Sequence, residues 1–320
     1  MSATTDPLTN PSWLHRAAAL VRRGQALLAL ALALALGMVG VAPVHAQDAG
    51  ALRAQHDQLR DKLANTPFQR PLILESAQTT ATLKGDVYAV VDQPFTALAP
   101  ALQGMEHWCD LLILHLNVKN CSSSGKPPGE VLRLVVGRKF DQPLADAYSV
   151  DFNYSVPAAT ADYLRVQMAA DSGPLGTRNY QLALEAVALD AKRSFIHMSY
   201  SYSYGLAARI AMQGYLATMG SDKIGFSVTA RRGDGKRVYV SGLRGVVERN
   251  TMRYYLAIEA YLGALAAPKP DQLEKRLRDW FAATERHPAQ LHEIERDEYL
   301  AMKHRETQRQ QAMARSAKLN

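Results

Sequence analysis

Several short segments of the chain alternate between apolar and polar residues, and this alternation restricts the possible folds most strongly. The clearest example is YSVDFNYSV at 148–156, and HMSYSYSYG at 197–205 aligns Tyr200, Tyr202 and Tyr204 in the same way. Successive side chains of a β-strand point to opposite faces, so each segment predicts a strand with one apolar face. Further segments of this kind are 132–136, 164–168 and 179–185.

Turn-rich links such as ALDAKR and DSGPLG join these strands and indicate an antiparallel sheet with one buried face. A buried face needs a cover, and the best candidate is a helix over residues 252–265. Arg253 and Glu259 are its only charged residues, and a helix that is apolar nearly all round is a buried one. We place Glu248 and Asn250 at its start, where a carboxylate and an asparagine cap are both favourable.

The first residues predict a secretory signal peptide. Arg16, Arg22 and Arg23 precede the apolar run ALLALALALALGMVGVAP, and the small residues of VHA allow cleavage after Ala46. We therefore expect a periplasmic or secreted protein. An uncleaved membrane anchor is the alternative, and the export route, general or twin-arginine, stays open. The residue directly after the predicted cleavage site is Gln47 and not a cysteine, so a lipid anchor is not expected.

Cys109 and Cys121 are the only two cysteines. In an oxidising compartment a nearby pair most simply forms one disulfide, which stabilises the fold by roughly 3 kcal/mol in the chain-entropy model. A catalytic thiol or a metal-binding pair is the rival interpretation. Removal of residues 1–46 takes away three arginines and one aspartate, which leaves 34 Lys and Arg against 29 Asp and Glu, a modest and scattered net charge of about +5. It favours contact with an anionic membrane surface over nucleic acid, which an exported protein seldom meets.

The common catalytic motifs are missing from the sequence. It contains no G-x-S-x-G, H-E-x-x-H, P-loop or dinucleotide fingerprint, and DSGPLGT at 171–177 is most simply a turn. His107, His115 and His197 follow no spacing that is typical of a metal site. We therefore expect no catalytic residue, no metal and no cofactor.

The segment from Val87 to Trp108, VYAVVDQPFTALAPALQGMEHW, is typical of a strand, a Pro-Phe turn and a short helix that ends near a tryptophan. Together with the one-faced strands and the apolar helix, it resembles the START-like superfamily, also called SRPBCC or helix-grip, over about residues 84–266. The resemblance implies an α+β fold in which a curved antiparallel sheet grips a long C-terminal helix. A cavity for lipids, sterols or polyketides would lie between them. The chain departs from the pattern in a helix expected at 206–219, the cysteine pair and an added charged helical C-terminal extension.

The composition divides the chain into four parts. Residues 51–64 predict an amphipathic helix, and beyond residue 266 the sequence becomes charge-dense, with two helices broken near Pro288 and a frayed end. The expected parts are a signal peptide at 1–46, an N-terminal helix and linker at 47–83, a START-like ligand-binding domain at 84–266 and a charged helical tail at 267–320.

The resemblance places the apolar faces of the later strands on the wall of the cavity. A tyrosine ring with a polar tip suits either such a wall or an ordinary packed core, and both interpretations stay open. Arg253 must find a partner inside its apolar helix, so it is a better candidate for binding an anionic group than Arg178 or Arg249. The candidate ligand-binding residues are Phe152, Tyr154, Tyr180, Leu182, Tyr200, Tyr202, Tyr204, Arg253, Tyr254 and Tyr255.

We therefore expect an exported, non-catalytic protein that binds an apolar or amphiphilic small molecule such as a lipid. One alternative is a cyclase- or hydrolase-type enzyme that uses a tyrosine or histidine of the same cavity as general acid and base. The other is a structural envelope protein that acts through its C-terminal tail.

Overall fold

The computed structural model describes residues 44–206, 208–210, 214 and 223–319. Residues 1–43 of the expected signal peptide at 1–46 lie outside the described residues. Most of the helix expected at 206–219 also lies outside them. The chain divides after Gln47, and Asp48–Asn320 form one compact unit. No helix within the described ranges combines the length and the apolar character that a bilayer crossing requires.

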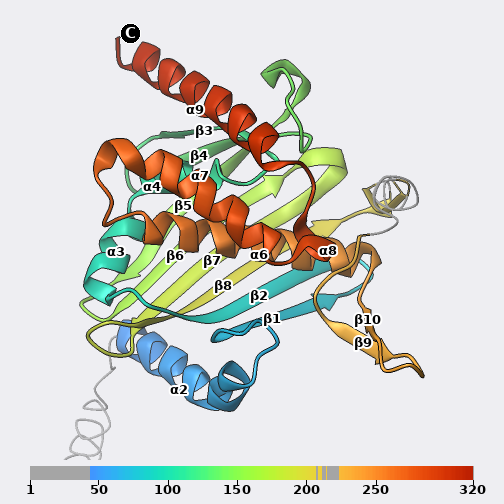
Figure 1. Cartoon of the computed structure of the whole chain (residues 1–320). Helices are drawn as coiled ribbons and strands as arrows, with labels where there is room; N and C mark the ends of the chain where they lie inside the picture. The colour runs from blue at the N-terminus through green and yellow to red at the C-terminus, as the bar shows by residue number, and fades with distance from the viewer. Residues whose placement is uncertain (1–43, 207, 211–213, 215–222, 320) are drawn as a thin grey trace, which may run out of the picture. The chain divides into compact units, whose positions relative to one another are not determined.

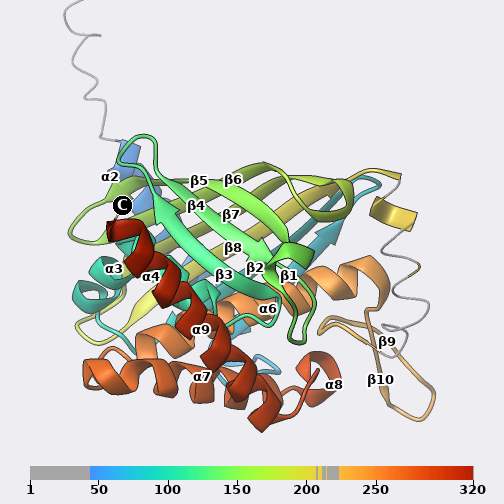
Figure 2. The same cartoon turned by 90° about the horizontal axis from the view of Figure 1, so that it is seen from above.

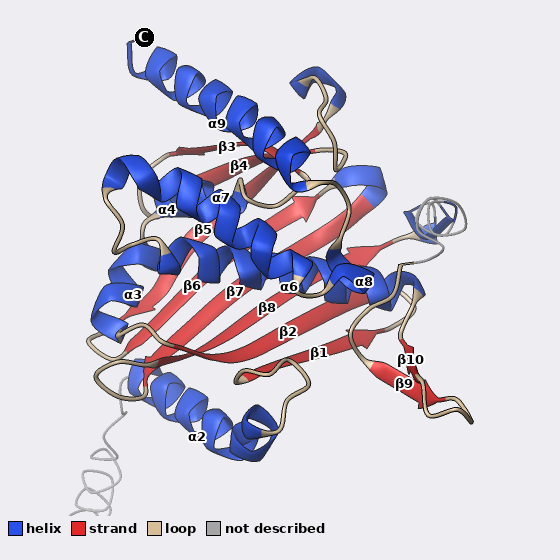
Figure 3. Cartoon of the chain, in the orientation of Figure 1, coloured by secondary structure: helices blue, strands red, loops and turns tan. Residues whose placement is uncertain are grey.

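An antiparallel sheet of eight strands forms the centre of the unit Asp48–Asn320 (Figure 1, Figure 3). Its strand order is β1-β2-β8-β7-β6-β5-β4-β3. Each of the alternating segments forms one of these strands, as predicted. The strands are β1 (Leu72–Gln78), β2 (Thr82–Val91), β3 (Val118–Ser124), β4 (Val131–Val136), β5 (Tyr148–Ala159), β6 (Tyr163–Ser172), β7 (Thr177–Ala188) and β8 (Ser194–Tyr204).

Helix α6 (Gly242–Gly263) lies across one face of the sheet, as the view from above shows (Figure 2). Met252 and Leu256 of α6 are completely buried. At Gly85 of β2 a Cβ atom would collide with the side chain of Thr251, so this glycine allows the helix to approach the sheet closely. The curved sheet and the helix that it grips confirm the predicted α+β helix-grip fold.

Helix α6 begins ten residues before the expected helix over 252–265, so the predicted capping roles of Glu248 and Asn250 are wrong. Glu248 lies in the second turn and is completely buried. Its carboxylate accepts hydrogen bonds from the backbone N–H groups of Phe226 and Ser227, at 2.6 and 2.9 Å, and from the Ser76 hydroxyl. Glu248 therefore joins α6 to β1 and to the start of the hairpin formed by β9 (Val228–Arg231) and β10 (Arg237–Tyr239).

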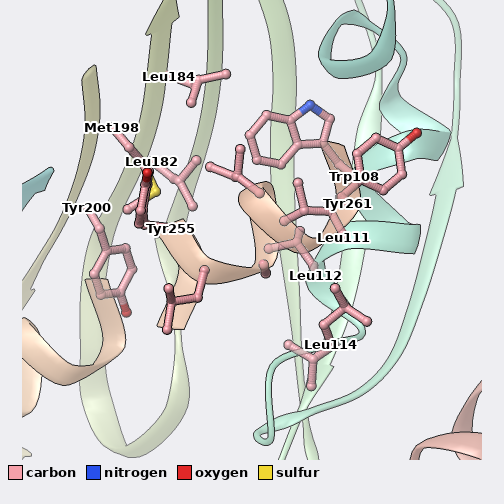
Figure 4. Close-up of a cluster of buried hydrophobic side chains, with 14 of the residues drawn as sticks. Trp108, Leu111, Leu112, Leu114, Leu182, Leu184, Met198, Tyr200, Tyr255 and Tyr261 are labelled. Atoms are coloured by element: carbon pink, nitrogen blue, oxygen red, sulfur yellow. The ribbon is translucent and has the colours of Figure 1, made fainter. Parts of the chain in front are cut away.

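Helices α3 (Phe95–Gln103) and α4 (Met105–Leu112) complete the core on the same face of the sheet. Figure 4 shows Trp108 beside leucines of α4 and a tyrosine of α6. The Trp108 indole donates a hydrogen bond to the Leu102 carbonyl at 2.7 Å, which satisfies its buried N–H group. A disulfide joins Cys109 of α4 to Cys121 of β3, as predicted.

Helix α2 (Val44–Ala64) partly covers the opposite face of the sheet. The sequence predicts that only one face of the sheet is buried. Leu59 and Leu63 of α2 pack with Tyr163, Val187 and Phe195, whose side chains point away from α6. At one end of this contact Arg53 forms an ion pair with Asp162 at 2.7 Å. The amphipathic helix expected at 51–64 is therefore part of the folded unit.

The segments expected as a linker and as a frayed tail both belong to the fold. Strand β1 lies inside the expected linker at 47–83 and pairs with β2. Beyond residue 266, Trp280 and Tyr299 are buried and their rings stack with centroids 5.0 Å apart. The interruption near Pro288 is confirmed, since the helices of this region are α7 (Lys269–Glu285), α8 (Pro288–Leu291) and α9 (Arg296–Leu319).

Candidate functional site

A pocket of about 520 Å³ lies between strands β4, β5, β7 and β8 and helix α6. Tyr148 and Leu175, each about half exposed, belong to its lining, so solvent reaches it. We call it the tyrosine pocket. Its lining residues in the described ranges are His115, Asn117, Leu134, Val136, Gly137, Arg138, Gln142, Asp146, Tyr148, Val150, Phe152, Pro174, Leu175, Thr177, Tyr180, Tyr200, Tyr202, Val246, Asn250 and Tyr254.

Strand geometry explains why the aromatic rings gather here. Tyr200 and Tyr202 occupy alternate positions of β8 and therefore share the face that looks toward α6. Tyr180 of the neighbouring β7 stacks on Tyr202 with ring centroids 5.2 Å apart, and Tyr254 of α6 lies 5.2 Å from Tyr200. A Cβ at Gly173 would collide with the Tyr180 ring, so this glycine makes room for the ring.

The tyrosine hydroxyls at the pocket differ in their partners. The Tyr180 hydroxyl lies 2.7 Å from the Thr177 hydroxyl. Within the described part of the chain, the hydroxyls of Tyr200, Tyr202 and Tyr254 make no hydrogen bond. Burial raises the pKa of all three, so the phenol protons stay in place at neutral pH and remain available for donation.

His115 was not among the candidate residues, yet it is the most informative polar group of the pocket. It lies between α4 and β3, is 2 % exposed, and stacks on Tyr254 with ring centroids 4.7 Å apart. Its Nδ1 accepts the backbone N–H of Asn117 at 3.1 Å. In the described residues its Nε2 has no hydrogen-bond partner. An alternation pattern cannot reveal such a residue, because His115 belongs to a connection rather than a strand.

Five of the ten predicted residues line the tyrosine pocket, and the other five do not. Phe152, Tyr180, Tyr200, Tyr202 and Tyr254 line it. Leu182 and Tyr204 share the same face of the sheet but lie outside the lining. The Tyr204 hydroxyl donates to the Thr79 carbonyl at 2.9 Å, which uses its polar tip elsewhere.

Three further predicted residues have partners inside the protein and do not line the tyrosine pocket. The Tyr154 hydroxyl donates to the Gln103 carbonyl at 2.8 Å, and the Tyr255 hydroxyl donates to the Glu259 carboxylate at 2.6 Å. Arg253 is 1 % exposed and pairs with Glu293 at 2.7 Å. A segment beyond the expected domain supplies this counter-charge, and the ligand role of Arg253 stays a prediction.

A second polar cluster lies on the sheet face that points away from α6. The Nε2 of His197 is 2.9 Å from an Asp86 oxygen and its Nδ1 is 3.2 Å from a Glu185 oxygen. The Tyr88 ring stacks on the imidazole at 4.4 Å, and Tyr163 donates to Glu185 at 2.6 Å. Both ring nitrogens are thus used, and the cluster resembles a structural ion-pair network. Among the described residues, no group of three or more side chains is arranged to hold a metal ion.

Comparison with known proteins identifies no close relative. No protein-family model matches the sequence, and no curated protein matches it. Several solved structures resemble the fold.

A point mutant of norcoclaurine synthase from Thalictrum flavum has 18 % identity and a TM-score of 0.31, covering 45 % of this chain and 93 % of that one. The Zhui aromatase/cyclase from Streptomyces sp. R1128 has 10 % identity and a TM-score of 0.30, covering 64 % and 94 %. A START superfamily protein from Mycobacterium smegmatis has 12 % identity and a TM-score of 0.31, covering 44 % and 89 %. At these values none of them carries an argument about function.

Proposed function

We propose that this protein binds an apolar or amphiphilic small molecule, such as a lipid, in the tyrosine pocket. The resemblance of the sequence to the START-like superfamily implies a cavity for a ligand of this kind. The observation that carries the proposal is a set of three tyrosines, the buried Tyr200 and Tyr202 and the partly buried Tyr254, whose hydroxyls have no partner among the described residues. In an ordinary core such hydroxyls would be bonded to protein groups, as those of Tyr154, Tyr204 and Tyr255 are.

The pocket walls supply binding energy mainly by removing apolar surface from water. Phe152 and Val246 lie on opposite walls, one on β5 and one on α6. Burying apolar ligand surface contributes about 25 cal/mol per Å², and the tyrosine hydroxyls orient the polar atoms of the ligand. This combination of apolar walls and a few polar groups is typical of small-molecule sites.

The protonation states in the pocket disfavour a tyrosine as general base. A tyrosine acts as a general base only as phenolate, and burial raises the pKa values of Tyr200, Tyr202 and Tyr254 away from neutral pH. Burial, and then the charge of nearby cations, lowers the pKa of His115 well below 6.5. These groups therefore favour hydrogen-bond donation to a ligand.

We propose further that the mature protein works outside the cytoplasm, in the periplasm or after secretion. The predicted signal peptide supports this location, and the disulfide between Cys109 and Cys121 suits an oxidising compartment. The positive charge of the mature chain, about +5 with 34 Lys and Arg against 29 Asp and Glu, supports transient contact with an anionic membrane surface, from which an amphiphile could be taken up.

The proposal is tested by titrating the protein with the neutral fluorescent probe N-phenyl-1-naphthylamine. We expect saturable fluorescence enhancement in the wild type and at least a tenfold weaker affinity in Val246→Trp, because the indole fills the pocket. Ala266→Trp, at an exposed position after α6, is the matched control and should bind like the wild type. Equal binding by all three proteins, or no saturable binding by any, would contradict the proposed site.

A further inference from the structure

His115 is deeply buried, belongs to the residues that line the pocket, and has one unused hydrogen-bonding atom. Because Nδ1 accepts the Asn117 N–H, its lone pair is occupied and a neutral ring carries its proton on Nε2. That Nε2–H group has no acceptor among the described residues. An unpaired buried donor costs about 1 to 3 kcal/mol, so a ligand oxygen that accepts this hydrogen bond would recover the loss.

The ring has little freedom to find another partner. It stacks on Tyr254 with ring planes 26° apart, and the His115 carbonyl accepts a hydrogen bond from the Lys303 ammonium at 2.7 Å. The backbone on one side and the tyrosine ring on the other hold the imidazole in place. A donor that is fixed before the ligand arrives loses little entropy on binding.

The electrostatic surroundings of His115 are positive. Arg253, Lys303, Lys139 and Lys119 all act on the ring as cations, although Glu293 and Glu306 pair with them. Arg138 also lines the pocket, whereas Asp146, which is exposed, is the one acidic residue among the described lining residues. A positive potential in a partly desolvated site favours a negatively charged oxygen over a neutral one, and disfavours a cationic head group.

We infer that the tyrosine pocket selects amphiphiles whose polar end is a carboxylate, and that His115 is the specificity-determining donor to that carboxylate. This inference rests on the proposed binding function and names its ligand class. The carboxylate accepts the Nε2–H group of His115, while the apolar chain or ring system lies against Phe152, Val246 and the tyrosines. A charge-assisted hydrogen bond of this kind changes affinity by about tenfold to a hundredfold.

The test compares cis-parinaric acid with its methyl ester, which has the same polyene chain but no charge. We expect the wild type to bind the acid at least tenfold more tightly than the ester at pH 7.5. Equal affinity for both would overturn the inference while leaving the binding function intact. Failure to bind either probe would remove the binding function and the inference together.

Two variants isolate the donor. In His115→Asn the amide oxygen can replace Nδ1 as acceptor of the Asn117 N–H, but no donor reaches the position of Nε2. In His115→Gln an amide N–H can reach that position. We expect the preference for the acid to fall below threefold in His115→Asn and to be partly retained in His115→Gln, with unchanged ester binding in both. An unchanged preference in His115→Asn would overturn the role of His115. If His115→Asn does not fold, the ratio of the wild-type affinities for the acid and the ester still decides the ligand class.

Discussion

At the scale of single residues, the pocket tyrosines and the core tyrosines have similar burial but different partners. Tyr202 is 5 % exposed and Tyr255 is 1 % exposed. The Tyr255 hydroxyl is bonded to Glu259, whereas the Tyr202 ring stacks on Tyr180 at the pocket and its hydroxyl has no partner among the described residues. The alternation of residues along β8 predicts which face of the sheet Tyr202 lies on. No sequence pattern predicts which tyrosine hydroxyl has a hydrogen-bond partner inside the protein.

Tyr202→Ala should therefore weaken ligand binding more than folding, because it enlarges a space that is already open. We expect at least a tenfold loss of N-phenyl-1-naphthylamine affinity and a free energy of unfolding that falls by less than 3 kcal/mol. Tyr255→Ala, the control in the packed core, should lose about 3 to 5 kcal/mol. Denaturant unfolding and probe titration of both variants measure the two effects. A large stability loss in Tyr202→Ala with unchanged affinity would exclude the residue from the site.

The His197 cluster predicts a pH dependence of stability. Burial works against the charged imidazole, but the Asp86 and Glu185 carboxylates outweigh it and raise the pKa of His197 above 6.5. A raised histidine pKa in the folded state stabilises the protein fully below pH 6.5, and this contribution is lost as the pH rises through the folded-state pKa. The Tyr88 ring and Lys84, which pairs with Asp86, complete the surroundings of the cluster.

His197→Gln should therefore cost about 1 to 3 kcal/mol of unfolding free energy at pH 6, the scale of hydrogen bonds to charged groups. The difference from the wild type should shrink at pH 9, because a rising pH favours the neutral imidazole, which lacks the stabilising charge. Urea unfolding of both proteins at the two pH values gives this difference and cancels the contribution of other titrating groups. A difference that is the same at both pH values would show that His197 is not charged in the folded protein.

At the scale of elements, α9 is anchored by buried charges as well as by apolar side chains such as Tyr299 and Met302. Lys119 of β3 and Lys303 of α9 share the Glu306 carboxylate, at 3.1 and 2.8 Å, and all three residues are completely buried. Lys303 also donates to the carbonyls of His115 and Val118. Burial lowers the pKa of Lys303 to about 8, so it is mostly charged at neutral pH.

These contacts explain why the sequence suggested a frayed tail. Charge-dense helices are usually solvated, and the partner that buries Lys303 and Glu306 lies about 185 positions earlier in the chain, where no local pattern connects them. Strand β1 was missed for a different reason. It is an edge strand of mixed burial, so the apolar alternation that revealed β5 and β8 is weak in LILESAQ. The alternating strands and the gripping helix, which depend on local periodicity, could be predicted.

Glu306→Gln should destabilise the protein by about 3 to 5 kcal/mol, because two lysines remain buried without their counter-charge. Glu298→Gln, at an exposed position of the same helix, is the control and should change stability by less than about 0.5 kcal/mol. Thermal and denaturant unfolding measure both changes. Similar stability of the two variants would mean that α9 is a dispensable tail.

At the scale of the whole molecule, the disulfide connects the proposed location to stability. Cys109 and Cys121 close a segment with a sequence separation of 12 that leads from α4 through His115 to β3. The bridge therefore also restrains the connection that carries the proposed ligand donor. Loop closure of this length stabilises a fold by roughly 3 kcal/mol in the chain-entropy model.

Cys109→Ser/Cys121→Ser should lower the unfolding free energy by about 2 to 4 kcal/mol, and a reducing agent should have the same effect on the wild type. Peptide mapping without reduction, on protein recovered from the exported fraction, should show the two cysteines linked and a new N-terminus near Gln47. Two free thiols in a protein that retains its first 46 residues would contradict export.

The central claim is that the space between the sheet and α6 holds an amphiphilic ligand. Native mass spectrometry of the protein purified from its own cells, without detergent, tests it most directly. We predict a mass increment of one bound amphiphile that denaturation releases, and that Val246→Trp lacks while Ala266→Trp retains it. A wild-type spectrum with the mass of the bare chain alone, in protein that also fails to bind N-phenyl-1-naphthylamine, would contradict the claim.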